Sequence, residues 1–187
     1  MRKDLGKKSW LFPMPVLIIG TYDENGVPDA MNAAWGSMYD YNQVTISLGS
    51  HVTTDNIRKN KAFTISFATK STVASSDFVG IVSLKDEPNK LAKAKLTPIK
   101  SEKVHAPLFK EYPLTLECSL VSIDGNIGEG ATVVGQIENI SVDESILTDG
   151  KVDFKKFEVI SFDPANNKYR LVGEEVADAF RVGMKLK

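Results

Sequence analysis

Residues 47–57 combine a strand end with a helix start that is suited to an anion. Small polar residues close an alternating strand, and Thr53 and Thr54 then lead into a predicted helix. The first N–H groups of a helix have no partner within the helix, so a negative group can accept hydrogen bonds from them, and hydroxyl groups can add more. His51 can contribute positive charge. The pattern fits a monophosphate, and plain helix capping by a threonine is the competing interpretation.

A second candidate site lies between Met31 and Met38, where Asn32, Ala33, Ala34 and Trp35 follow one another. Small side chains let a flat ring approach backbone amides closely, and a tryptophan can cover such a ring. Flat heterocycles bind in mostly apolar slots that carry a few polar anchors. Tight strand packing around a buried tryptophan is the alternative.

The cysteine and histidine content argues against thiol and metal chemistry. One cysteine and two histidines supply neither an internal disulfide nor a cysteine-rich or histidine-rich metal site. Cys118 falls in an alternating strand pattern, so we expect a small buried side chain. The glycine-rich loop 125–130 does not satisfy G-x-G-x-x-G, and no helix follows it, so we predict a mobile hairpin loop.

Length and composition point to one globular domain over residues 1–187. Hydrophobic residues make up 42% and charged residues 25%, and the formal net charge is -1. This balance gives no electrostatic basis for binding nucleic acid. The apolar stretch 10–20 contains Pro13 and Pro15 and is too short to span a bilayer as a helix. We therefore expect no membrane association and a cytoplasmic location.

The elements that must position these sites are mainly strands. Alternating or β-branched patterns predict strands over residues 16–22, 28–37, 43–49, 62–68, 114–123 and 131–142, with a last hairpin over 159–162 and 168–171. Helical patterns cover residues 53–60, 71–82 and 88–95, and a connector with three prolines covers 98–113. Short connections between the first strands favour an antiparallel sheet or barrel.

In their order and spacing, several segments resemble the flavin reductase-like family, the FMN-binding split barrels of the flavoredoxin type. The matching segments are Pro13–Val16, Gly20–Asp23, Asn32–Gly36, Ser50–Ile57, Asp77–Ser83, Leu96–Pro98 and Pro113–Cys118. The resemblance covers about residues 10–142. It implies a mainly β fold with helical excursions, a split β-barrel, and a homodimer with non-covalent FMN near the subunit interface.

The resemblance also implies a set of cofactor-binding residues. The phosphate would lie among Ser50, His51, Thr53, Thr54 and Asn56. The isoalloxazine would lie along Asn32, Ala33, Ala34 and Trp35, with backbone contacts from Ser47 and Leu48 and a neighbouring loop at Ser83.

Three positions depart from the family pattern. His51 stands where the family commonly has arginine or lysine, and Ser83-Leu84-Lys85 replaces a frequent Ser-Gly-Arg. Many family reductases also have a histidine in the loop before the strand 131–142, where this chain has only Gly128-Glu129-Gly130. His105, in the connector, would have to reach the site from a partner chain. We therefore expect inefficient use of NADH or NADPH.

These observations favour an FMN-dependent oxidoreductase or electron carrier, in which the flavin carries the electrons and the protein positions it. The electron partner would be NADH, NADPH or a redox protein. Two alternatives are a non-catalytic β-barrel that holds FMN or another small ligand for storage or sensing, and a dimeric structural domain with an empty cleft.

Overall fold

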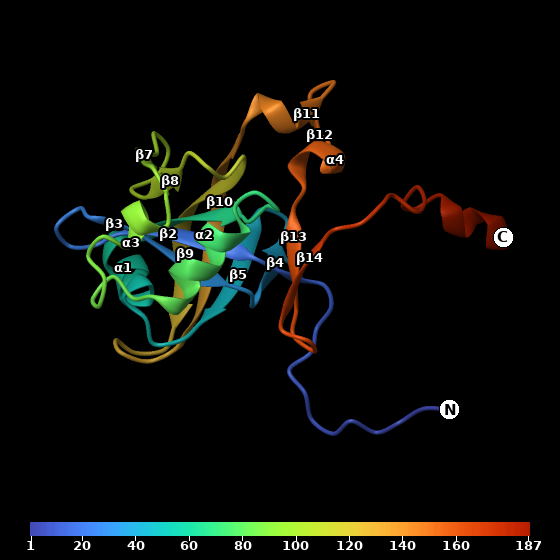
Figure 1. The fold of residues 1–187 in the computed structure, drawn as a ribbon, viewed down its shortest axis with the longest axis horizontal. Coiled ribbons are helices and arrows are strands. Elements are labelled where there is room, and N and C mark those ends of the chain that lie inside the picture. Colours follow the sequence, from blue (N-terminus) through green and yellow to red (C-terminus); the bar gives the residue numbers. More distant parts are fainter.

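The computed structural model describes residues 1–187 and consists mainly of β-strands (Figure 1). Seven strands form one antiparallel sheet in the order β3-β2-β6-β9-β10-β5-β4. Their bounds are β2 (Leu17–Tyr22), β3 (Pro28–Ala33), β4 (Gly36–Asp40), β5 (Gln43–Leu48), β6 (Ala62–Phe67), β9 (Leu114–Asp124) and β10 (Ala131–Val142). The edge strands β3 and β4 follow one another along the chain, and no ladder joins them. The fold is a split barrel, as predicted, and the sheet is not closed between these two edge strands.

The barrel interior is filled by the side chains that point inward at alternate positions along each strand. Leu17 and Ile19 of β2 pack with Phe63 of β6 in one cluster, and α1 (Val52–Asn60) adds Ile57 to it. On the other face of β2, Ile18 packs with Val79 of α2 (Val73–Ile81). Strand β2 is buried on both faces. This explains why its sequence begins as a continuous apolar run instead of an alternation of apolar and polar residues.

Cys118 has the structural role that its strand pattern predicts. Its thiol is fully buried in the barrel cluster and has no disulfide partner. Burial raises the pKa of this thiol to about 12. A thiol with that pKa is protonated at neutral pH and is therefore a poor nucleophile.

The remaining elements surround the barrel. They are β1 (Met14–Pro15), α3 (Lys90–Lys93), β7 (Pro98–Lys100), β8 (Pro107–Phe109), the 3-10 helix η1 (Glu144–Ile146), β11 (Leu147–Thr148), β12 (Lys151–Val152), α4 (Phe154–Phe157), β13 (Ile160–Asp163), β14 (Lys168–Leu171) and η2 (Val182–Leu186). The β13–β14 hairpin confirms the predicted last hairpin, and β1 pairs with β13. None of the helices has the length and apolar character that crossing a membrane requires.

Three expected elements differ in the structure. The strand expected over residues 28–37 breaks at Ala34 and Trp35, and β4 then turns to pair with β5. This close packing suits Gly36, where an added Cβ would lie 2.7 Å from Leu17 Cδ1. The proline-rich connector contains the β7–β8 hairpin, in which Pro98 and Pro107 are the first residues of their strands, where a missing N–H is tolerated. Helix α1 begins at Val52, and no threonine caps it.

Candidate functional site

A cleft of about 390 Å³ opens where β3, the start of α1 and the end of α2 meet. Asp29, Met31 and Asn32 of β3 form one wall, and residues 50–53 form another. The end of α2, the loop 82–86 and Lys90 of α3 complete it. Two segments that the sequence singled out separately, 31–38 and 47–57, therefore face the same cleft.

The start of α1 presents backbone N–H groups to this cleft. His51 is the N-cap residue, with an extended backbone (φ -132, ψ 154), and its side chain makes no capping hydrogen bond. The N–H groups of Thr54 and Asp55 donate to the His51 carbonyl, at 3.0 and 3.4 Å. Val52 and Thr53, the first two helical residues, have no carbonyl partner within the helix. Both residues line the cleft, so their N–H groups and the positive end of the helix dipole could hold an anion there.

A buried ion pair lies at the floor of the cleft. Lys90 Nζ is 3.0 Å from Asp29 Oδ1, and both side chains are 3% exposed. The Thr53 hydroxyl donates to Asp29 Oδ2 at 3.5 Å. Lys90 therefore neutralises a carboxylate that would otherwise oppose an anion in the cleft. The sequence did not single out Asp29 or Lys90, which lie 61 residues apart.

The structure turns several predicted phosphate ligands away from the cleft. The Thr54 hydroxyl is buried and donates to the Gly49 carbonyl at 2.9 Å, and Asn56 Nδ2 donates to Thr21 Oγ1 at 3.2 Å. Neither residue lines the cleft. The Ser50 hydroxyl donates to the carbonyl of Gly128 at 2.6 Å. The polar side chains at 50, 54 and 56 thus hold the turn and the helix in place.

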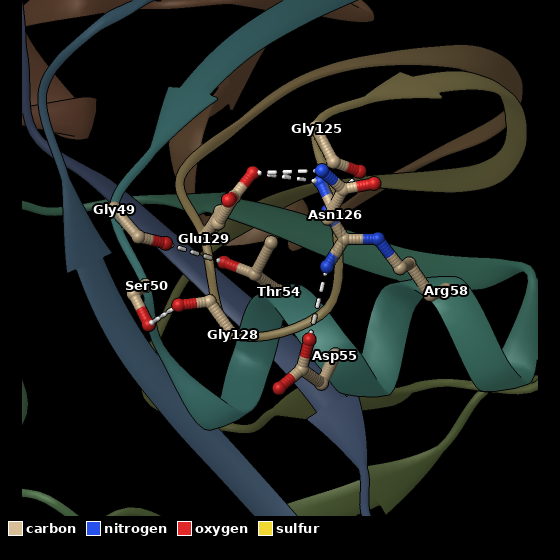
Figure 2. A network of polar contacts seen from close by, with 9 residues as sticks. All are labelled: Gly49, Ser50, Thr54, Asp55, Arg58, Gly125, Asn126, Gly128 and Glu129. Carbon is tan, nitrogen blue, oxygen red and sulfur yellow. Dashed lines mark hydrogen bonds and ion pairs between the residues drawn. The ribbon is translucent and has the colours of Figure 1, made fainter.

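The glycine-rich loop 125–130 is attached to α1 (Figure 2). Besides the bond from Ser50, Arg58 Nη2 donates to the Gly125 carbonyl at 2.7 Å, and Arg58 Nη1 pairs with Asp55 at 2.9 Å. Glu129 turns back within the loop and accepts from Asn126 Nδ2 at 3.0 Å. These bonds restrain the loop, which the sequence predicts to be mobile. They also direct the Glu129 carboxylate toward Asn126.

The cleft continues along β3 into a second cavity of about 250 Å³ that shares Asn32, Gly80 and Ile81 with the first. Its walls add Ala33 and Ala34. Asn32 Nδ2 donates to the Ser76 carbonyl at 2.9 Å, and a Cβ added at Gly80 would lie 2.8 Å from the Asn32 Cβ. Glycine at position 80 therefore lets α2 approach β3 and shapes this groove.

Tyr169 of β14 also lines the second cavity. Its hydroxyl donates to Asp77 Oδ1 at 2.7 Å. Burial, and then the Asp77 carboxylate, raise the pKa of this phenol to about 12, so it stays protonated at neutral pH. A protonated phenol is a fixed donor that holds the β13–β14 hairpin against α2.

Trp35 and the end of β5 were also predicted to contact the flavin ring. Trp35 is 57% exposed, so the alternative of a buried tryptophan is wrong. It lines a third cavity together with residues 9 and 11–15 near the N-terminus. Its carbonyl accepts a hydrogen bond from the Ser47 N–H at 2.8 Å. Ser47 also lines that cavity, whereas the Leu48 side chain points into the barrel core.

The loop after α2 supplies the remaining predicted residue. Ser83 lines the first cleft, and its hydroxyl accepts from the N–H of Lys85 at 3.2 Å. Lys85 is exposed and lines the same cleft as His51. His105 instead packs against the Tyr22 ring, with centroids 5.2 Å apart, and does not line the cleft.

Known proteins share both the sequence family and the fold. The family model described as the flavin reductase like domain matches residues 9–157. Flavoredoxin of Desulfovibrio vulgaris (Miyazaki F) is 34% identical, with a TM-score of 0.91 over 98% of this chain and 100% of that one. Flavoredoxin from Methanosarcina acetivorans is 25% identical, with a TM-score of 0.89 over 100% of both chains.

Nitrilotriacetate monooxygenase component B from Bacillus cereus is similar in fold. It is 22% identical, with a TM-score of 0.78 over 89% of this chain and 88% of that one. No curated protein sequence matches the chain.

Proposed function

The chain belongs to the flavin reductase-like family, and from this membership we propose that it binds FMN in the groove along β3 and exchanges electrons as a redox protein of the flavoredoxin type. The start of α1 is the observation that carries the proposal. There, two N–H groups without helical partners line the cleft together with His51 and Lys85. A monophosphate is the anion that such a compact site accepts best.

The proposed ring site follows from the same groove. If the phosphate lies at Val52 and Thr53, the flavin ring extends along Asn32, Ala33 and Ala34 toward Trp35. The alanines and Gly80 leave room for a flat ring against backbone, and the Asn32 amide supplies a polar anchor. Ser83 and the backbone at Ser47 and Leu48 belong to the same proposed set.

The residues present fit an FMN cofactor. A bound flavin would supply the electron-transfer chemistry, and this chain supplies position and charge. Lys90 keeps Asp29 neutralised beneath the phosphate site. The side chains of Thr54 and Asn56 act indirectly, because their hydrogen bonds to Gly49 and Thr21 hold α1 in the orientation that exposes its first N–H groups.

We further propose that residues 1–187 act as one domain, in a cytoplasmic homodimer. The partner is a second copy of the chain, and the electron donor is a redox protein in preference to a pyridine nucleotide.

Chromophore identification tests the cofactor. We expect purified protein to release FMN on denaturation, identified by mass, because the site is compact and the chain lacks a dinucleotide fingerprint. Protein obtained without chromophore should bind added FMN with one site per chain. Release of FAD, or no binding at excess FMN, would contradict the proposal.

Poor turnover with NADH and NADPH is the second expected result. Hydride transfer requires the donor ring at about 3–3.5 Å from the flavin, so a group that holds the nicotinamide sets much of the rate. The loop 125–130 offers no imidazole, and its bonds to Ser50 and Arg58 fix its position. Steady-state oxidation of each nucleotide, with free FMN as acceptor, measures this. A turnover number within the ordinary range of roughly 1–10³ s⁻¹ would restore a direct reductase.

A further inference from the structure

The β13–β14 hairpin, residues 160–171, lies beyond the residues 9–157 that the family model matches. It stands at the side of the barrel (Figure 1). Its base is fixed, because β13 pairs with β1 and the Ile160 N–H donates to the Ala68 carbonyl at 3.1 Å. Any wall that the hairpin gives to a cavity therefore comes from outside the matched domain.

The hairpin supplies two aromatic side chains to the second cavity, which is also the proposed ring site. Phe162 and Tyr169 line this cavity together with Ala33 and Ala34 of β3. The two aromatic residues are paired across the hairpin, and their ring centroids lie 6.1 Å apart. Ile81 at the end of α2 lines the same cavity and is 75% exposed. The small residues of β3, the hairpin and Ile81 thus offer apolar surface for a flat ring to cover.

One hydrogen bond joins the hairpin to α2. The Tyr169 hydroxyl donates to Asp77 Oδ1 at 2.7 Å, and no other hydrogen bond runs between the hairpin and this helix. The phenol is protonated at neutral pH, so its donor is always present. Hydrogen bonds to an ionised acceptor are stronger than those between neutral groups. This single bond therefore fixes the Tyr169 ring as a wall of the cavity.

We propose that Tyr169, held by Asp77, is a positioning residue for the flavin ring and slows release of the flavin. This role rests on the proposed function, which places the ring along Asn32, Ala33 and Ala34. An electron carrier needs such a wall, because it must keep one flavin through many redox cycles. The contact concerns the ring, so it should act equally on FMN and riboflavin, whereas the start of α1 distinguishes the two by the phosphate.

Removing the hydroxyl tests this role. Tyr169→Phe keeps an aromatic side chain and loses the bond to Asp77, so the wall is no longer held in place. We expect the dissociation rates of FMN and riboflavin to rise by the same factor, about 3- to 10-fold, which corresponds to the net value of one hydrogen bond. Flavin fluorescence after rapid dilution of the loaded protein measures both rates. Tyr41→Phe, at an exposed tyrosine that does not line the cavity, is the matched control and should change neither rate.

Variants of Asp77 separate the hydrogen bond from a general loss of structure. Asp77→Ala removes the acceptor and should match Tyr169→Phe, whereas Asp77→Asn keeps an acceptor oxygen and should stay close to the wild type. The double variant Asp77→Ala, Tyr169→Phe should release flavin no faster than either single variant, because both substitutions remove the same bond. Circular dichroism checks that each variant keeps its fold.

Three results would refute the role of Tyr169: unchanged dissociation rates in Tyr169→Phe, a rise for FMN alone, or single effects that multiply in the double variant. In each of these results the flavin still binds, so the proposed function stands. A wild-type chain that binds neither flavin would instead contradict the proposed function and the role of Tyr169 together.

Discussion

Replacing Val52 by proline is expected to weaken FMN binding by about 10- to 150-fold while changing riboflavin binding little. The substitution removes one N–H donor at the start of α1, and a hydrogen bond to a charged group is worth about 1.5–3 kcal/mol. Proline is well tolerated at the first helical position. The extended backbone of His51 also suits a residue that precedes proline. Only FMN carries the phosphate, so only FMN should lose affinity.

Val52→Ala is the matched control, because it shortens the same side chain and keeps the N–H. Flavin affinities of both variants can be measured by fluorescence quenching, and circular dichroism checks that the helix content is retained. Equal losses for FMN and riboflavin in Val52→Pro would place the phosphate elsewhere.

Replacing Lys90 by methionine is expected to destabilise the protein without ligand by about 3–5 kcal/mol, since it leaves the Asp29 carboxylate buried without its cation. The remaining donors to this carboxylate are the Ala30 N–H at 2.8 Å and the Thr53 hydroxyl at 3.5 Å, and neither carries a charge. Urea unfolding followed by circular dichroism gives the difference in the free energy of unfolding.

The double variant Asp29→Asn, Lys90→Met separates the ion pair from simple loss of packing. With the buried charge removed as well, most of the lost stability should return, because replacing both members of a buried pair costs far less than removing one. A double variant as unstable as Lys90→Met alone would show that packing of the lysine chain, and not the charge, supports the cleft.

Much of the barrel follows from local pattern. The alternation over 43–49 and 62–68 predicts β5 and β6, because each strand has one face in the barrel. Helix α1 is predicted from the polar residues at its start and from the two cations in its last turn, Arg58 and Lys59. Two-residue strands such as β1 and β11 are too short to show a period, and only their tertiary partners define them.

The candidate site is harder to predict from the sequence than the barrel is. Thr54 and Asn56 have the right chemistry for phosphate ligands, but the same short polar groups can equally satisfy the backbone and the core, and the fold uses them in that way. The Asp29–Lys90 pair joins a strand to a helix that follows 61 residues later. No local periodicity marks such a pairing.

Amide NMR of the full chain during flavin titration tests the central claim most directly. With FMN, the account predicts that the Val52 and Thr53 N–H signals shift strongly, together with those of Ala33 and Ala34. With riboflavin, the β3 signals should shift while those of Val52 and Thr53 change little. Indistinguishable shifts for the two flavins at the start of α1, or shifts confined to residues outside the cleft, would contradict FMN binding at this helix.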